Sequence, residues 1–256
     1  MRILVVEDDI NVAALLERRL GRDGFNVQQT DTGEEAIDLA RHYPFDLVLL
    51  DLNLPDITGQ TVLRRLRMID ARIPVMVLSG DDATETRLRC FQLGADDFMV
   101  KPCNGDELVA RVRAIIRRNN GHVTPTLEIG DLSVDTQARE VRAAGAPVPL
   151  TRREYQLLEF LALRRAKTIS KDALLNHMYD GADEPDAKII DVYVCKIRSK
   201  LAVVAPDLAA GIETVWGRGY ALKSGEPHVA HRAPPPPLSD VGLLPRHPVR
   251  RRTRAA

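Results

Sequence analysis

Several features are scarce in this sequence of 256 residues, and their scarcity narrows the possible classes of protein. The longest apolar runs contain only a handful of residues, too few to cross a bilayer. The opening residues, MRILVVEDD, reach acidic side chains too early for a secretory signal. Cys90, Cys103 and Cys195 lie far apart without CxxC spacing, which indicates reduced thiols. The sequence therefore predicts a cytoplasmic protein that does not enter the membrane.

The sequence also has no excess of either charge, since its 36 Lys and Arg residues and its 36 Asp and Glu residues give a formal net charge of zero. Residues 1–118 carry 16 basic and 20 acidic side chains, whereas residues 225–256 carry 6 basic and 2 acidic ones. A general nucleic-acid-binding protein is basic overall. Any contact of this chain with DNA therefore has to come from a local patch.

The residues that are present predict two globular domains. Hydrophobic residues make up 45% and charged residues 28% of the chain, which excludes collagen, coiled coil and wholesale disorder. A chain of this length is too long for one modest core and about right for two domains. We find no internal repeat.

Residues 1–118 alternate short apolar runs with segments of helix length. The runs ILVV, DLVLL and PVMVL are rich in Val, Ile and Leu, which is typical of strands buried on both faces of a parallel sheet. Helix-start signals with capping-box spacing occur at Thr32 and Asn104. Five strands alternating with five helices predict a doubly wound, flavodoxin-like α/β domain.

The pattern changes after residues 119–126, a polar segment with Gly and Pro that is typical of a linker. In residues 127–224, short alternating strands precede three helical segments, the first two with start signals at Thr151 and Ser170. A hairpin with flanking glycines comes last. This order predicts an α+β winged-helix domain that contains a helix-turn-helix. Residues 225–256 hold 7 of the 16 prolines, which predicts a disordered tail.

Three carboxylates are predicted to meet at one edge of the parallel sheet. Glu7 and Asp8 follow the first strand, and Asp51 follows the apolar core of the third. The carboxyl ends of such strands converge on one crevice, where three acids repel one another unless a cation lies among them. Oxygen ligands with open positions favour Mg²⁺. The sequence therefore predicts a magnesium site.

Two more polar residues are expected at the same edge, since Ser79 ends the fourth strand and Lys101 ends the fifth. A carboxylate can attack phosphorus and form an acyl phosphate, while a metal, an ammonium and a hydroxyl bind the phosphoryl oxygens. The alternative to a phosphorylation site is a set of unrelated, solvated acids at strand ends. A phosphohydrolase with an aspartate nucleophile fits the sequence poorly, because such an enzyme needs a second Asp at the position of Asn53.

The third helix of the C-terminal domain is predicted to have a buried and an exposed face. The buried stripe consists of Ile190, Val194, Ile197 and Leu201. On the outer face, Val192 can contact a thymine methyl and Lys196 can donate to guanine. Further candidates for contact with DNA are Lys188, Asp191, Arg198, Lys200 and, at the hairpin tip, Arg218. Arg198 and Lys200 suit phosphates, and Arg218 suits a phosphate or the minor groove.

The motifs VVED, LLDLNLPD, LSG and GADDFMVKP resemble, in order, those of the receiver domain of bacterial two-component response regulators. The resemblance implies that Asp51 accepts a phosphoryl group from a histidine kinase or a phosphotransfer protein. The implied ligands of Mg²⁺ are Glu7, Asp8, Asp51 and the backbone carbonyl of Asn53. Ser79 and Lys101 would contact the phosphoryl group, with a cis peptide after Lys101. Ser79 and Phe98 would form the switch, with Phe98 in place of the usual tyrosine.

In the OmpR/PhoB branch of this family, charged residues pair two receiver domains about a two-fold axis. The residues that match this face are Arg87, Asp96, Asp97, Glu107, Arg111 and Arg113. By this resemblance, Arg87 would meet Glu107 and Asp97 would meet Arg111 of a second copy. The alternative is an ordinary charged surface, on which single ion pairs contribute ~0–1 kcal/mol.

Residues 125–224 resemble the OmpR/PhoB-type DNA-binding domain and are most similar to that of alphaproteobacterial cell-cycle regulators. The resemblance implies binding to double-stranded promoter DNA as a tandem homodimer, and contact with RNA polymerase around Tyr179 to Glu184. The last two residues, Ala255 and Ala256, resemble a dipeptide that presents such a regulator to an ATP-dependent protease. A terminus without a signal, or a basic tail that adds nonspecific affinity for DNA, are the alternatives.

Together these patterns predict a transcriptional regulator switched by phosphorylation, and not an enzyme with turnover. A relay or catalytic protein is one alternative, but it would need an active site in the C-terminal half, where we find no nucleophile near a base. A constitutive DNA-binding regulator with a weakly signalling receiver domain is the other.

Overall fold

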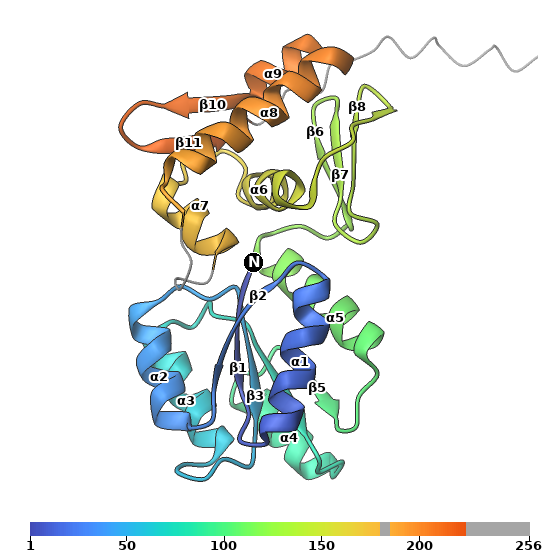
Figure 1. Ribbon diagram of the computed structural model, residues 1–256. Helices are drawn as coiled ribbons and strands as arrows, with labels where there is room; N and C mark the ends of the chain where they lie inside the picture. The colour runs from blue at the N-terminus through green and yellow to red at the C-terminus, as the bar shows by residue number, and fades with distance from the viewer. Residues whose placement is uncertain (180–184, 224–256) are drawn as a thin grey trace, which may run out of the picture.

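The computed structural model describes residues 1–179 and 185–223, which form two domains in contact with each other (Figure 1). The N-terminal domain is built on a parallel sheet of strand order β2-β1-β3-β4-β5. Its strands are β1 (Arg2–Val6), β2 (Asn26–Thr30), β3 (Leu47–Asp51), β4 (Val75–Ser79) and β5 (Asp97–Val100). This order confirms the predicted doubly wound topology and aligns the carboxyl ends of neighbouring strands.

Helices cover both faces of this sheet. They are α1 (Ile10–Arg22), α2 (Gly33–His42), α3 (Gly59–Ile69), α4 (Thr84–Gln92) and α5 (Gly105–Asn119). In β1, Ile3 and Val5 belong to the hydrophobic cluster that contains α1 and α5. Leu4 and Val6 belong to the cluster that contains α2 and α3. Burial on both faces explains why the sequence of each inner strand is a continuous apolar run.

The C-terminal domain begins with an antiparallel sheet of strand order β6-β7-β8-β9, and ends with the hairpin β10-β11. The strands are β6 (Thr126–Ile129), β7 (Leu132–Asp135), β8 (Glu140–Ala143), β9 (Ala146–Pro147), β10 (Ile212–Val215) and β11 (Gly219–Leu222). The helices between the sheets are α6 (Arg152–Leu163), α7 (Lys171–Met178), α8 (Lys188–Val204) and α9 (Pro206–Gly211). The winged-helix prediction is confirmed; α9 was not predicted.

Local side-chain contacts explain where the helices begin. Thr151 and Glu154 form both halves of the predicted capping box at α6, and the Ser170 hydroxyl accepts from the backbone of Ala173 in α7. The side chain of Asn104 caps α5. At α2, however, the predicted cap Thr32 makes no capping hydrogen bond. The carboxylate of Asp56 accepts from the first two backbone N–H groups of α2 instead.

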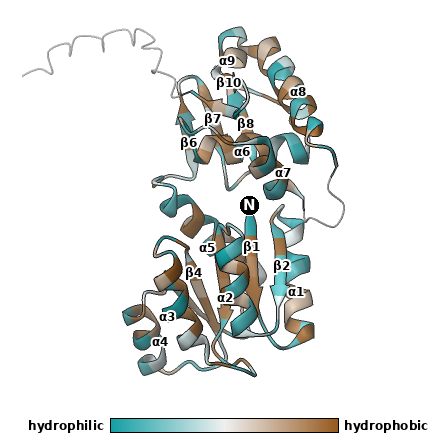
Figure 2. Cartoon of the chain, turned by 90° about the vertical axis from the view of Figure 1, so that its left-hand side faces the viewer, coloured by the Kyte–Doolittle hydropathy of each residue, from teal (hydrophilic) through white to brown (hydrophobic). Residues whose placement is uncertain are grey.

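Helix α5 ends at Asn119 and β6 begins at Thr126, so a short irregular segment joins the domains. The expected disordered tail, residues 225–256, lies outside the described residues. Figure 2 shows hydrophobic residues gathered along β1 and β4 inside the N-terminal domain. Within the described ranges, none of the helices has the length and apolar composition needed to cross a membrane.

Candidate functional site

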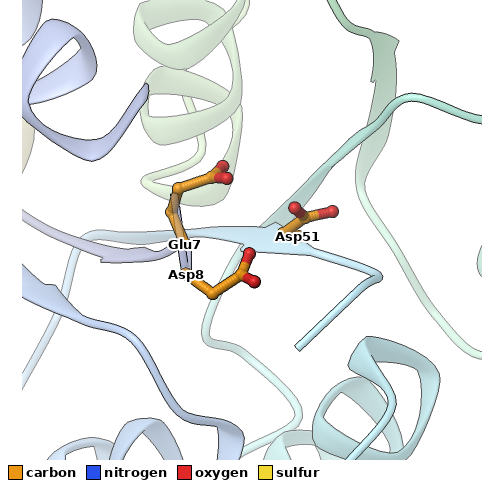
Figure 3. A group of neighbouring side chains, drawn as sticks. All are labelled: Glu7, Asp8 and Asp51. Carbon is orange, nitrogen blue, oxygen red and sulfur yellow. The ribbon is translucent and has the colours of Figure 1, made fainter. Parts of the chain in front are cut away.

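The three predicted acidic residues lie together at the carboxyl ends of β1 and β3 (Figure 3). Glu7 and Asp8 follow β1, and Asp51 is the last residue of β3. One carboxylate oxygen from each residue lies within 4.8 Å of the other two. Glu7 and Asp51 are buried, whereas Asp8 is exposed. The site is therefore open to solvent at Asp8.

Lys101 lies just after β5 and reaches two of these acids. Its Nζ donates to Glu7 Oε2 at 2.5 Å and to Asp51 Oδ2 at 2.7 Å. Burial raises the pKa of the Glu7 carboxyl above its ordinary value, although Lys101 opposes the shift. Burial alone would lower the pKa of Lys101, but the hydrogen bonds to Asp51 and Glu7 outweigh it and raise that pKa. The ammonium therefore stays charged and partly neutralises the acids.

Ser79 is the last residue of β4 and is 1% exposed. Its hydroxyl accepts from the backbone N–H of Asp81 at 3.1 Å. Asn53 is exposed, and its backbone N–H donates to Asp51 Oδ1 at 3.2 Å. The peptide after Lys101 is cis. All of these groups lie at the same edge of the sheet, where β3, β4 and β5 end side by side.

The donor set at this edge suits Mg²⁺. Three carboxylate oxygens at short mutual distances are hard oxygen ligands, and they leave room for the water and phosphoryl oxygens that Mg²⁺ retains. The partly buried acids outnumber the single ammonium of Lys101, so a second cation would relieve their repulsion. The residues present therefore fit the implied metal.

Gly59, the first residue of α3, supports this site and was not predicted. A Cβ atom at Gly59 would lie 2.1 Å from the carbonyl oxygen of Asp51 and 2.7 Å from Cα of Leu52. The backbone N–H of Gly59 donates to the carbonyl of Leu52 at 2.9 Å. Helix α3 can therefore approach the end of β3 only without a side chain here. The glycine that follows the LPDIT loop is the signal in the sequence.

The charged residues expected on a pairing face lie on α4, β5 and α5. Arg87 and Glu107 are exposed. Arg111 lies 2.9 Å from Asp97 and 2.7 Å from Glu107 of the same chain. Of the two expected pairs, Asp97 and Arg111 therefore already contact each other within one copy.

Two residues of the predicted face are engaged elsewhere. Asp96 pairs with Arg67 and accepts from the backbone of Val75. Arg113 is 7% exposed, and its guanidinium donates to the Thr136 carbonyl of the C-terminal domain at 3.0 Å. The assignment of Arg113 to an exposed pairing face is therefore wrong. Its side chain points away from that face, into the contact between the two domains.

The expected switch residue Phe98 is 7% exposed and packs with Leu52, Val77 and Cys90. The guanidinium of Arg87 lies 5.8 Å from the centre of its ring. The aromatic side chain therefore occupies the buried position between β5 and α4.

The predicted DNA-contacting residues fall into two groups. Lys188, Val192, Lys196 and the hairpin residue Arg218 are exposed. The buried stripe of α8 consists of Ile190, Val194, Ile197 and Leu201, as predicted. This division leaves one polar face of α8 free beside the hairpin.

The remaining three predicted residues form contacts within the domain. Asp191 pairs with Lys171 and accepts from the hydroxyl of Tyr220. Arg198 donates to the carbonyl of Ile212 and to the hydroxyl of Thr214. Lys200 pairs with the buried carboxylate of Glu154 at 2.7 Å. These side chains hold α8 against the hairpin and α6.

Trp216, which the sequence patterns did not single out, lies between β10 and β11 and is 90% exposed. A cleft of about 590 Å³ runs between this hairpin, α7 and α8, and its lining includes Trp216 and Arg218. A large indole with no cover is unusual on a protein surface. The signal in the sequence that could have identified this residue is that the chain's one tryptophan lies in a turn next to glycine.

Comparisons with known proteins give two family matches. Residues 3–113 match the response regulator receiver domain, and residues 145–222 match the C-terminal domain of transcriptional regulatory proteins. The chain is 49% identical over 223 residues to the cell cycle transcriptional regulator CtrA of Caulobacter vibrioides, covering 87% of this chain and 96% of that protein. It is 48% identical over 233 residues to the cell cycle response regulator CtrA of Brucella abortus, covering 91% of this chain and 100% of that protein. The response regulator DrrB of Thermotoga maritima, an OmpR/PhoB homologue, gives a TM-score of 0.43 at 29% identity, over 87% of this chain and 98% of that one.

Proposed function

Because this chain belongs to the response regulators that join a receiver domain to an OmpR/PhoB-type DNA-binding domain, we propose that phosphorylation of Asp51 switches its binding to promoter DNA. It is a CtrA-like regulator of transcription. The observation that carries the proposal is the contact of Lys101 with both Glu7 and Asp51 at an open, acidic sheet edge. A histidine kinase or a phosphotransfer protein would supply the phosphoryl group.

In the proposed reaction, a carboxylate oxygen of Asp51 attacks the phosphorus of a phosphohistidine. The new O–P bond forms as the P–N bond breaks, and the imidazole leaves after taking up a proton from solvent. Lys101, already held beside Asp51, would bind one phosphoryl oxygen, and the Ser79 hydroxyl another. Mg²⁺ bound by Glu7, Asp8, Asp51 and the Asn53 carbonyl would neutralise charge on the phosphoryl oxygens.

Phosphorylation would then favour pairing of two receiver domains through α4, β5 and α5. The Ser79 hydroxyl would turn from the Asp81 backbone toward the phosphoryl group, and Phe98 would move with it. Arg87 and Glu107 are exposed, and Asp97 and Arg111 are partly exposed, so these residues would exchange partners between copies. Pairing raises the local concentration of two DNA-binding domains over neighbouring half-sites.

In the proposed complex, α8 enters the major groove. Val192 and Lys196 would contact base edges, and Lys188 would contact the backbone. Arg218 suits a phosphate or the minor groove, and the exposed indole of Trp216 would pack against the sugars beside it. The asymmetry of charge along the chain agrees with a local rather than a global basic surface.

The test is Asp51→Asn in the full chain, with Asp38→Asn on the exposed face of α2 as the matched control. We expect Asp51→Asn to abolish Mg²⁺-dependent labelling by radioactive acetyl phosphate, and to weaken both dimerisation and binding to a promoter fragment. The control should behave as wild type. Unchanged labelling of Asp51→Asn would refute the assignment of the phosphorylation site.

A constitutive DNA-binding regulator is the second candidate, because Phe98 cannot make the hydrogen bond of a tyrosine switch. This candidate predicts equal DNA affinity with and without acetyl phosphate.

Two further partners are proposed. Contact with RNA polymerase would involve Tyr179 and the residues up to Glu184, and a protease signal would involve Ala255 and Ala256. Residues 180–184 and 224–256 lie outside the described part of the chain. Promoter binding places the proposed activity in the cytoplasm.

A further inference from the structure

The loop between β3 and α3, residues 52–58, carries part of the proposed metal site. Asp51 lies immediately before this loop, and Asn53, whose carbonyl is the fourth implied ligand of Mg²⁺, lies within it. Asn53 is exposed. A backbone carbonyl binds a metal ion well only where the surrounding structure holds it in place. The contacts of this loop with the rest of the receiver domain therefore bear on metal binding.

Asp56 ties the middle of the loop to helix α2. Its Oδ1 accepts from the backbone N–H of Gly33 at 2.9 Å, and its Oδ2 accepts from the backbone N–H of Glu34 at 2.8 Å. Burial alone would raise the pKa of Asp56, but the hydrogen bonds from Glu34 and Gly33 outweigh it and hold that pKa below the ordinary value. Both oxygens of a charged carboxylate are therefore engaged by α2.

Helix α2 obtains its N-terminal cap from this carboxylate. Thr32 occupies the N-cap position with an extended backbone, as a capping residue does, but its side chain makes no capping hydrogen bond. Asp56, which lies 23 positions after Gly33, accepts instead. A cap supplied from another loop stabilises the helix and also fixes the distance between the helix and that loop. A local cap has only the first of these two effects.

The loop packs closely on α2 beside Asp56. A Cβ atom at Gly33 would lie 2.6 Å from Cγ1 of Ile57 and 2.5 Å from Cγ2 of Val62 in α3. At the far end of the loop, a Cβ atom at Gly59 would collide with the end of β3. Two glycines therefore allow α2 and α3 to approach the loop so closely that it has little room to shift while Asp56 is held.

Helix α2 is in turn tied to the strand that leads into the acidic site. Thr30 is the last residue of β2, and its hydroxyl donates to the carboxylate of Glu35 in the first turn of α2 at 2.6 Å. The backbone carbonyl of Thr30 accepts from the N–H of Glu7 at 3.0 Å. A series of hydrogen bonds therefore leads from Asp56 through α2 and β2 to Glu7, on the opposite side of the proposed metal site.

We propose that Asp56 is a positioning residue for Mg²⁺, which holds the loop after β3 at the distance from the end of β1 that the metal site requires. This inference rests on the proposed function, because it assumes that Glu7, Asp51 and the Asn53 carbonyl bind Mg²⁺. Without the carboxylate of Asp56, the loop loses its hydrogen bonds to α2, and the Asn53 carbonyl occupies its ligand position for only part of the time. Affinity for Mg²⁺ falls, whereas the chemistry of the loaded site does not change.

The first test is Asp56→Ala in the full chain, with Asp38→Ala on the exposed surface of α2 as the matched control. Titration with MgCl₂, followed by NMR shifts of the backbone amides of Glu7 and Asn53, measures the dissociation constant without phosphorylation. We expect this constant to rise about tenfold in Asp56→Ala and to stay at the wild-type value in the control.

The rate of labelling by radioactive acetyl phosphate gives a second readout for Asp56→Ala. Labelling should be slower than in wild type at low Mg²⁺ and should return to the wild-type rate at saturating Mg²⁺. A general loss of structure would instead leave the rate low at every concentration of Mg²⁺.

The double variant Thr32→Asp/Asp56→Ala separates positioning from capping. An acid at the N-cap position gives α2 a local cap and restores the net charge, without the hydrogen bonds between the helix and the loop. We expect the stability in urea to return to nearly the wild-type value, and the dissociation constant of Mg²⁺ to remain about tenfold higher. Because α2 stays capped, this variant also provides the measurement if Asp56→Ala folds poorly.

Two results would overturn the proposal. One is an Asp56→Ala chain that binds Mg²⁺ as tightly as wild type. The other is a double variant that recovers affinity for Mg²⁺ together with stability, since Asp56 would then act only as a cap of α2. A wild-type chain that neither binds Mg²⁺ nor is labelled counts against the proposed function instead, and the measurements on wild type detect this separately.

Discussion

Gly59 shows how the absence of a single side chain determines the position of Asp51. Gly59→Ala would place Cβ 2.1 Å from the Asp51 carbonyl, so α3 or the end of β3 has to move. We expect a loss of at least about 2 kcal/mol in the free energy of unfolding, measured in urea, and weaker labelling by acetyl phosphate. Gly21→Ala is the control, because a Cβ atom there would have no neighbour within 4 Å and α1 gains helix propensity. A Gly59→Ala chain with wild-type stability would contradict this account of the site.

At this scale, the sequence predicted residues whose role follows from their place at a strand end. Glu7, Asp51 and Lys101 come together because parallel strands end at the same edge, whatever the rest of the chain does. Arg113 could not be placed in this way, because its partners Thr136 and Glu159 belong to the other domain. Nor did strand position identify Gly59, whose role depends on how closely α3 approaches β3.

At the scale of the element, α8 combines a DNA-binding face with a supporting one. Lys196→Met removes an exposed charge, so we expect about tenfold weaker DNA binding and unchanged stability. Lys200→Met leaves the buried carboxylate of Glu154 with only the Thr151 contacts of the capping box, so we expect a loss of about 1–2 kcal/mol in the free energy of unfolding. Gel shifts measure the DNA affinity of both variants, and urea unfolding measures their stability. Each variant serves as the control for the other. Equal effects of the two changes on DNA binding would contradict the division of this helix.

Periodicity predicted which side of α8 is buried, because Ile190, Val194 and Ile197 recur at helical spacing. It could not distinguish a lysine that faces DNA from one that faces a neighbouring helix, since both lie off the apolar stripe. The same limit explains why α9 was missed. None of its residues is buried, so it carries no core stripe to recognise.

At the scale of the molecule, the fold of each domain was predictable and their contact was not. Strand order and the winged helix follow from patterns within each half. The interface between the domains depends on pairs such as Asp46 with Arg164, separated by 118 positions, and neither half shows in its own pattern that it needs the other. The contact nevertheless sets how the receiver domain and α8 are oriented relative to each other.

The interface between the domains also makes stability depend on pH through His177. Burial lowers the pKa of His177 to about 3, while Asp46, Arg164 and the Met1 amine face its ring. Burial alone would raise the pKa of Asp46, but its contacts with His177 and Arg164 hold that pKa below the ordinary value, so Asp46 stays charged. The unfolded chain takes up a proton on His177 below about pH 6.5 and the folded chain does not. The stability that a neutral His177 provides is therefore complete above that pH and is lost as the pH falls toward 3, by up to about 1.4 kcal/mol per pH unit.

Urea unfolding of the full chain between pH 7 and pH 4 measures this loss. In His177→Phe, which keeps an aromatic ring against Phe160 but cannot titrate, we expect a shallower decline than in wild type. His42→Phe changes an exposed histidine of α2 and should leave the wild-type slope intact. Burial also lowers the pKa of the Met1 amine, which contacts His177, to about 5. Because Asp46 is charged throughout this range, the difference between the two variants reports the protons taken up by His177 and by this amine. If His177→Phe and wild type lose stability at the same rate, the pH dependence arises from groups other than His177.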